Sequence, residues 1–266
     1  MPKIGRCSRF AAKALIAFCL GVGFSQEALA DRPGAILNVW PLTGGGPGGG
    51  DAFRIMYGST GLNGEPIQVS AAIFIPPGDP PAGGRNVIAW AHPTSGVVET
   101  CAPSLMPDVA GMVWGLPDML AKGYVVVATD YPGLGSPGIH PYLFGVSEGR
   151  AVLVVWGHSQ GGHASLYTGE LAASYAPDLK LVGVAAAAPA TYLVELFDAD
   201  KASATGKELT AMALYAWSKL YNTPADPLVE PDAMAVFERM AHDCIESVAQ
   251  FVALDNAEKP LAQEST

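Results

Sequence analysis

The chain has 266 residues, of which 50% are hydrophobic and 15% are charged, so it has enough apolar side chains for a sizeable core. Its formal net charge of −10 argues against nucleic acid and anionic membrane surfaces as partners, because an acidic surface is repelled by both. A chain of this length is expected to form one domain with at most an appended cap.

The first thirty residues have the pattern of a secretory signal peptide. Basic residues precede an apolar run over 14–24, and Ala28-Leu29-Ala30 is a small-residue cleavage pattern. The apolar run is too short for a permanent membrane-spanning helix. We predict cleavage after Ala30 and a secreted protein without a stable membrane span; an uncleaved N-terminal anchor is the alternative. Cleavage removes four basic residues and one acidic residue, which changes the net charge from −10 to −13.

Two cysteines, Cys101 and Cys244, remain after this cleavage. In an oxidising compartment they are expected to form one disulfide, which would stabilise the fold by about 4 to 5 kcal/mol in the chain-entropy model. Two separate buried thiols are the alternative. No cluster of Cys and His residues has the spacing of metal ligands, so we predict neither a metal nor a cofactor.

The chain after the signal peptide begins with a short apolar piece, 35–40, and a Gly-rich connector within 31–50 that is unsuited to regular structure. The folded core is therefore expected to start at residue 51. Two β-rich segments, 52–60 and 67–76, are separated by the turn sequence GLNGEP, which predicts an antiparallel hairpin.

From there strands and helices are predicted to alternate. Continuous apolar segments at 86–92, 124–130, 152–156 and 181–190 are typical of buried parallel strands, and helices are expected over 105–123, interrupted by Pro117, and after Ser159. This order predicts an α/β fold with a doubly wound, mostly parallel sheet, whose sites lie at the carboxyl ends of strands. His92, Asp130 and Ser159 fall at such ends.

Beyond residue 193 the pattern becomes entirely helical. Apolar residues recur three and four apart over 207–221 and 231–254. We interpret 194–266 as a helical cap over the site, following a core at 51–193; ordinary packing of these helices against the sheet is the alternative.

The segment VLVVWGHSQGG is the strongest functional signal in the chain. Ser159 lies in a G-x-S-x-G pattern with a predicted strand before it and a helix after it. This context places a nucleophilic serine on a sharp turn above the sheet, and small residues two positions away on each side let the backbone bend. Chance matches to such a short pattern are common in Gly-rich chains, but the flanking elements favour catalysis.

Four ordered blocks of sequence resemble the secretory lipase family of α/β-hydrolases, the group related to yeast lipase A. They are IAWAHPTSG with CAPS, GYVVVATDYPGLGSPGIHPYL, VVWGHSQGGHASLYTGELA and YAPDLKLVGVAAAAPAT. The resemblance implies a secreted esterase or triacylglycerol lipase of lipid catabolism, which forms an acyl-enzyme at Ser159 and uses no cofactor. Its substrate would be a lipid or another acyl ester.

The tetrahedral intermediate of such a reaction needs two preorganised N–H donors. One is expected to be the backbone N–H of Gln160, the residue after the nucleophile. The second should come from the loop after the strand 86–92, where the family usually has His-Gly-Thr and this chain has His-Pro-Thr. Because Pro93 has no N–H, we assign the second donor to Thr94, with Ser95 as the alternative.

The sequence departs from the family in two places. Few residues separate the HPYL segment from the strand before Ser159, so we expect either a compressed crossover or a strained sheet. The acid and base are also missing from their usual place after later strands. We therefore expect the C-terminal strands of the domain to be absent.

Only two histidines follow the nucleophile. His163 lies one helical turn beyond Ser159 and is not suited to reach it, and His242 is a weak candidate base with Asp226 or Asp232 as its acid. A truncated, non-catalytic protein that binds acyl chains, an acyltransferase and a serine peptidase remain alternatives, and the oligomeric state stays open. His158 is expected to shape the elbow and Asp130 to have a structural role in its loop, with a place in the pocket lining as the alternative for Asp130. His92 and His140 resemble loop positions of the family, and the sequence assigns them no role.

Overall fold

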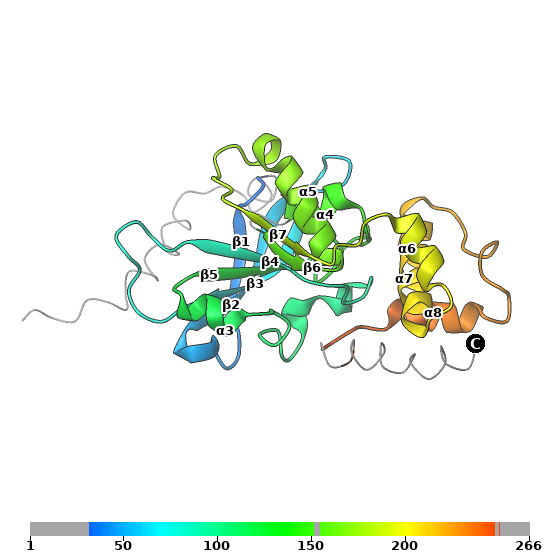
Figure 1. The fold of residues 1–266 in the computed structure, drawn as a ribbon, viewed down its shortest axis with the longest axis horizontal. Coiled ribbons are helices and arrows are strands. Elements are labelled where there is room, and N and C mark those ends of the chain that lie inside the picture. Colours follow the sequence, from blue (N-terminus) through cyan, green and yellow to red (C-terminus); the bar gives the residue numbers. More distant parts are fainter. Residues whose placement is uncertain (1–31, 152–154, 248–249, 251–266) are drawn as a thin grey trace, which may run out of the picture.

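The computed structural model describes residues 32–151, 155–247 and residue 250. A seven-stranded sheet of order β1-β2-β3-β5-β4-β6-β7 forms the centre of this described part (Figure 1). The predicted signal peptide lies outside the described residues. No helix within them is both long enough and apolar enough to cross a membrane.

One half of the sheet is antiparallel. The predicted hairpin is confirmed: β2 (Asp51–Thr60) pairs with β3 (Pro66–Ile75) along its whole length. The expectation that the folded core starts after the Gly-rich connector is wrong, because β1 (Ile36–Pro41) precedes the connector and pairs with β2. The connector reverses the chain tightly, with the Gly46 N–H donating to Gly50 O at 2.9 Å.

The other half of the sheet is parallel, as predicted. The strands β5 (Val125–Thr129), β4 (Val87–Ala91), β6 (Val155–His158) and β7 (Val184–Ala187) are neighbours in that order. The core beneath them is apolar and includes fully buried Trp90 and Val126. Part of the predicted strand 152–156 lies outside the described residues.

The last of these strands is less covered than the sequence suggests. A buried strand was expected, but β7 lies at the edge of the sheet and Val184 is 40% exposed. Its apolar composition is therefore not a consequence of burial within the described part of the chain.

Helices cover both faces of the sheet. In Figure 1, α4 (Gly145–Ala151) and α5 (Gln160–Tyr175) lie on one face, and α3 (Leu116–Ala121) lies on the other. The helix predicted over 105–123 is wrong for most of its length, because only α3 forms. Pro117 lies in the first turn of α3, where its missing N–H is tolerated, and so starts the helix instead of interrupting it.

The connection before β6 contains one short helix. The single seven-residue helix α4 packs against α5 and precedes β6, which ends at His158; residues 152–154, between them, lie outside the described residues. Of the two alternatives for this region, the short helix agrees with a compressed crossover.

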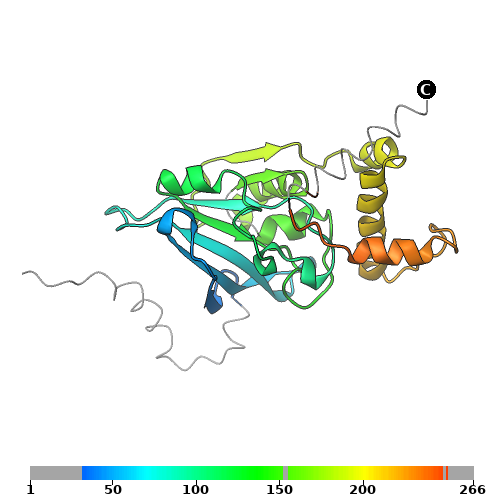
Figure 2. The ribbon, with the colours of Figure 1, turned by 90° about the horizontal axis from the view of Figure 1, so that it is seen from below.

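The remaining helices form a group beside the sheet, at the end where the parallel strands finish (Figures 1 and 2). They are α6 (Leu193–Asp200), α7 (Ala204–Leu220) and α8 (Met234–His242), and α6 was not predicted. An apolar cluster joins this group to the core loops. Its buried members are Val97, Tyr142, Leu143, Met212, Ala213, Ala216 and Ile245.

The helix predicted over 231–254 is too long. It ends at His242, and the following residues return in extended form to the core, where the Ile245 N–H donates to Ser95 O at 3.0 Å. The predicted disulfide between Cys101 and Cys244 is present. Burial of Ile245 and the covalent bond outweigh the helical periodicity of this segment, which explains the error.

Candidate active site

Ser159 occupies a strained turn between β6 and α5. Its backbone has φ 57° and ψ −119°, a conformation that non-glycine residues rarely adopt. Three backbone hydrogen bonds hold it there. The Ser159 N–H donates to Ala187 O at 3.0 Å, and Ser159 O accepts from the N–H groups of His163 at 3.0 Å and Ala190 at 3.2 Å. The turn is thus fixed by both neighbouring elements.

The glycines around Ser159 are required by close backbone contacts. A Cβ atom on Gly157 would lie 2.2 Å from Gly161 O, and one on Gly161 would lie 1.9 Å from Ala91 O. These distances are far inside van der Waals contact. The small residues of the G-x-S-x-G pattern therefore let α5 start directly against the end of β4, which leads into the loop that carries Thr94.

The two predicted N–H donors lie at this junction. Among the described residues, neither the Gln160 N–H nor the Thr94 N–H donates a hydrogen bond. Gln160 begins α5, where the first amides have no partner within the helix and carry the positive end of the helix dipole. N–H groups of this kind can donate hydrogen bonds to an oxygen atom on which negative charge develops.

The Thr94 side chain is already engaged. Its Oγ1 lies 2.9 Å from the Tyr142 hydroxyl, and the residue is 2% exposed. A small cavity of about 20 Å³ lies next to it, with space for one water molecule. The cavity is lined by Pro93, Thr94, Met112, Trp114, His158, Ile245 and Ser247.

The structure does not bring the candidate base to the nucleophile. No hydrogen bond among the described residues involves the Ser159 hydroxyl. His242 lies at the end of α8, with Nδ1 2.7 Å from Glu238 O and Nε2 3.2 Å from the Tyr215 hydroxyl. Both ring nitrogens are therefore occupied within the helical group, and neither Asp226 nor Asp232 bonds to the ring in the described part.

The contacts of His163 do not indicate a catalytic role either. Its Nδ1 lies 3.5 Å from Glu148 Oε2, and its ring packs edge-on against Tyr167. The side chain is thus directed toward α4, which agrees with the prediction that it does not reach Ser159.

Three other histidines lie in or near the core. Burial lowers the pKa of His92 to about 4 and that of His140 to about 3, so both rings are neutral at neutral pH. His92 packs on Tyr131, and His140 bonds to Pro132 O at 2.9 Å. Burial also lowers the pKa of His158, which packs against Trp114.

Asp130 is fully buried at the end of β5. It accepts hydrogen bonds from the Ser70 hydroxyl at 2.5 Å and the Ser104 N–H at 3.0 Å, and burial raises its pKa to about 6 despite these bonds and the charge of Arg54. These partners tie the loop after β5 to β3 and to the loop around Ser104.

One buried acidic residue that contacts Gln160 was not predicted from the sequence. Glu148 on α4 is 0% exposed, and its Oε1 accepts from Gln160 Nε2 at 2.6 Å. The only signal for it in the sequence is an acidic residue in the segment that precedes an apolar strand. Within the described residues, no group of three or more His, Cys, Asp or Glu side chains could hold a metal ion.

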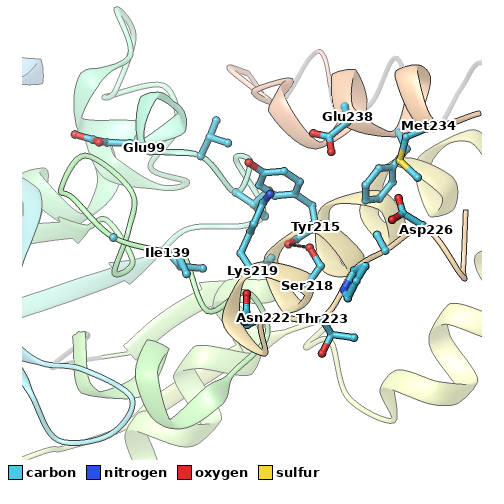
Figure 3. A pocket seen from close by; sticks show the side chains of 17 residues that line it. Glu99, Ile139, Tyr215, Ser218, Lys219, Asn222, Thr223, Asp226, Met234 and Glu238 are labelled. Atoms are coloured by element: carbon cyan, nitrogen blue, oxygen red, sulfur yellow. Dashed lines mark hydrogen bonds between the residues drawn. The ribbon is translucent and has the colours of Figure 1, made fainter.

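A cleft of about 650 Å³ lies between the helical group and the core loops (Figure 3). Tyr215 and Lys219 of α7 line one side, Glu238 of α8 lines another, and Glu99 and Ile139 come from the core. None of Ser159, Gln160 and Thr94 belongs to its lining. This cleft thus lies where the helical group meets the core, apart from the strained serine.

The fold and the turn at Ser159 define the class of protein: this is an α/β-hydrolase fold. Among solved structures, Candida antarctica lipase A in its closed state superposes with a TM-score of 0.63 at 18% identity, over 80% of this chain and 56% of that one. The rice cell wall degrading esterase LipA from Xanthomonas oryzae superposes with a TM-score of 0.60 at 25% identity, over 72% of this chain and 61% of that one.

Sequence comparison confirms the resemblance to the secretory lipases. The family model described as secretory lipase matches residues 143–256, and lipase A from Moesziomyces aphidis is 26% identical over 163 residues. That alignment covers 50% of this chain and 34% of the relative. The chain thus spans about a third of the length of lipase A from Moesziomyces aphidis and little more than half of the length of Candida antarctica lipase A.

Proposed function

We propose that the protein is a secreted carboxylic-ester hydrolase of the lipase and esterase kind, with Ser159 as its nucleophile. The observation that carries this proposal is the conformation of Ser159, held at φ 57° directly before Gln160 at the start of α5, whose N–H donates no hydrogen bond to any residue in the described part of the chain. Backbone strain of this kind persists only where surrounding contacts maintain it, and it is concentrated at functional sites.

In this reaction the Ser159 hydroxyl attacks the carbonyl carbon of an ester, and its proton passes to a base. The oxygen of the tetrahedral intermediate accepts from the N–H groups of Gln160 and Thr94. The alcohol leaves, and water then hydrolyses the acyl-enzyme. The names of the relatives, lipase and esterase, support an ester as the substrate, and we propose acyl esters such as triacylglycerols as its class.

The base is the least supported part of this proposal. His242 remains the candidate on the chain, but it can act only after it separates from Tyr215 and Glu238, to which both ring nitrogens are bonded. The absence of a hydrogen bond to the Ser159 hydroxyl among the described residues favours a second candidate function, a non-catalytic protein that binds acyl chains.

Labelling with a fluorescent phosphonate ester separates the two functions. An activated serine forms a covalent adduct with such a reagent, so we expect labelling of the folded protein at Ser159 and none of Ser159→Ala. Mass spectrometry of the labelled peptide identifies the residue. Folded protein that stays unlabelled would exclude the hydrolase and leave acyl binding, measured by displacement of a fluorescent fatty acid.

The assignment of Thr94 has its own test. Thr94→Pro removes the N–H and is expected to lower the turnover number for p-nitrophenyl esters by about 100-fold or more, the loss typical of a missing oxyanion donor. Thr94→Ser keeps both the N–H and the hydroxyl and is the matched control. Unchanged turnover in Thr94→Pro would transfer the role to Ser95.

A further inference from the structure

A buried network joins α4 to the residue that follows the nucleophile. Glu148 Oε1 accepts from Gln160 Nε2 at 2.6 Å and from the Leu143 N–H at 3.0 Å. His140 Nε2 lies 3.1 Å from the same Gln160 nitrogen. Glu148, Gln160 and His140 are each at most 1% exposed, so these contacts are shielded from water.

The direction of each hydrogen bond follows from the partners. Pro132 O can only accept, so His140 Nδ1, 2.9 Å away, carries the proton and donates to it. The ring is neutral because burial lowers its pKa to about 3, and Nε2 is therefore an acceptor. Gln160 Nε2 thus donates one hydrogen to His140 and the other to Glu148. The opposite orientation of the Gln160 amide would place the Gln160 side-chain oxygen against Glu148 Oε1.

The helix α4 is built to bring Glu148 to this place. A Cβ atom on Gly145 would lie 2.0 Å from the Tyr167 ring, and one on Gly149 would lie 2.9 Å from Thr168 N. Glycines on both sides of Glu148 therefore let α4 approach α5 closely. The carboxylate reaches the first turn of α5 as a result.

We propose that Glu148 is a positioning residue for the oxyanion donor: it fixes the side chain of Gln160 and, through it, the backbone N–H that receives the negative charge. This inference rests on the proposed hydrolase function. Both donor hydrogens of the Gln160 amide are used on the core side, so the side chain cannot turn toward the site. The peptide between Ser159 and Gln160 is held in one orientation before substrate arrives, and preorganised donors of this kind need no rearrangement during the reaction.

The first test follows the Gln160 amides by ¹H–¹⁵N NMR and does not depend on activity. Glu148→Ala is expected to shift the backbone resonance of Gln160 and to speed hydrogen exchange of its side-chain NH₂ group. The matched control is Asp130→Ala, which removes another fully buried carboxylate bonded to Ser70 and Ser104 and should leave both signals in place. A backbone resonance that shifts no more in Glu148→Ala than in Asp130→Ala would overturn the proposal.

The second test measures the rate of phosphonate labelling at Ser159. We expect Glu148→Ala to lower the maximal rate about 10-fold with little change in the concentration for half-maximal rate, because a displaced donor acts on the transition state. Glu148→Gln keeps a carbonyl acceptor for Gln160 and should retain a rate within about 3-fold of the original. Glu148→Met fills the same space and replaces Glu148→Ala if that variant does not fold.

The two tests separate the positioning role from the hydrolase function. An unlabelled original protein whose Gln160 resonance still depends on Glu148 would refute the hydrolase, and would show that Glu148 orients Gln160 without an oxyanion to receive. Labelling that is equally fast in all variants, or equally slow in Asp130→Ala and Glu148→Ala, would refute the positioning role alone.

Discussion

The elbow region and the edge region of this molecule are built in different ways. In the elbow region, which comprises α4, β6 and the first turn of α5, glycines permit close backbone contacts and Glu148 and Gln160 are fully buried. In the edge region, which comprises β7 and the helices α6 to α8, Tyr192 and Val194 are 80% and 79% exposed. The elbow region is fixed by dense packing, and the edge region by an apolar cluster and a disulfide.

This difference divides the proposed catalytic machinery. The proposed nucleophile Ser159 and the N–H of Gln160 lie in the elbow region, where Gly157 and Gly161 permit close backbone contacts, and the second proposed donor, Thr94, lies in the adjoining loop after β4. In hydrolases of this fold the acid and the base follow the nucleophile in the chain, and the candidate base, His242, lies at the end of α8 in the edge region. The proposed nucleophile thus lies in the densely packed part of the structure, and the candidate base lies in the other part.

The largest expected effect concerns the disulfide of the edge region. Replacing Cys101 and Cys244 together by Ala opens a link across 143 residues and is expected to lower the free energy of unfolding by about 4 to 5 kcal/mol. Urea unfolding followed by tryptophan fluorescence measures it, and the reduced original protein is the control. A loss below about 1 kcal/mol would mean that the apolar cluster alone secures the helical group.

A pair of glycine substitutions compares the regions directly. Gly161→Ala places a methyl group 1.9 Å from Ala91 O and should destabilise the protein by about 3 kcal/mol, whereas a Cβ on Gly183, just before β7, meets no atom within 4 Å. Gly183→Ala should change stability by less than about 0.5 kcal/mol. Similar losses in both variants, measured by urea unfolding, would show that the edge region is as tightly packed as the elbow.

Sequence patterns predicted the elbow region better than the edge region, and the reason is physical. The hairpin, the parallel strands and the turn at Ser159 depend on local signals: alternation, apolar runs and glycines beside the serine. The extended segment that contains Ile245 depends on a distant partner, Ser95, and on a disulfide, which helical periodicity cannot reveal. The exposure of Val184 likewise depends on what covers β7.

In the candidate site, too, the sequence predicted what depends on local signals and did not predict what depends on packing between distant segments. The serine motif specifies a strained turn by local steric requirements, so the turn at Ser159 and the helix that begins at Gln160 were predicted from sequence. Glu148 was missed because its role depends on α4 packing against α5, and an acidic residue on a short helix is more often solvated. The position of His242 also depended on where α8 ends.

The last expected effect is a change of stability with pH. Buried titratable groups in the core around the elbow should make the free energy of unfolding depend on pH. Burial lowers the pKa of His92 and His140 from 6.5 to about 4 and about 3, so the unfolded chain binds more protons as pH falls below 6.5. Each histidine then removes about 1.4 kcal/mol of stability per pH unit. Burial raises the pKa of Asp130 from 3.8 to about 6, which opposes this loss, because the folded state binds this proton more tightly.

Asp130→Asn separates the contribution of the Asp130 carboxylate to the pH dependence of stability from the contribution of the histidines. The variant lacks the opposing group, so between about pH 6 and pH 4 its stability should fall faster than that of the original protein, by about 1.4 kcal/mol per pH unit. Urea unfolding of both proteins across this range gives the difference in slope, in which the other titrating groups cancel. Parallel slopes would mean that Asp130 titrates alike in the folded and unfolded states, and burial beside Ser70 and Ser104 would then not hold a proton on it.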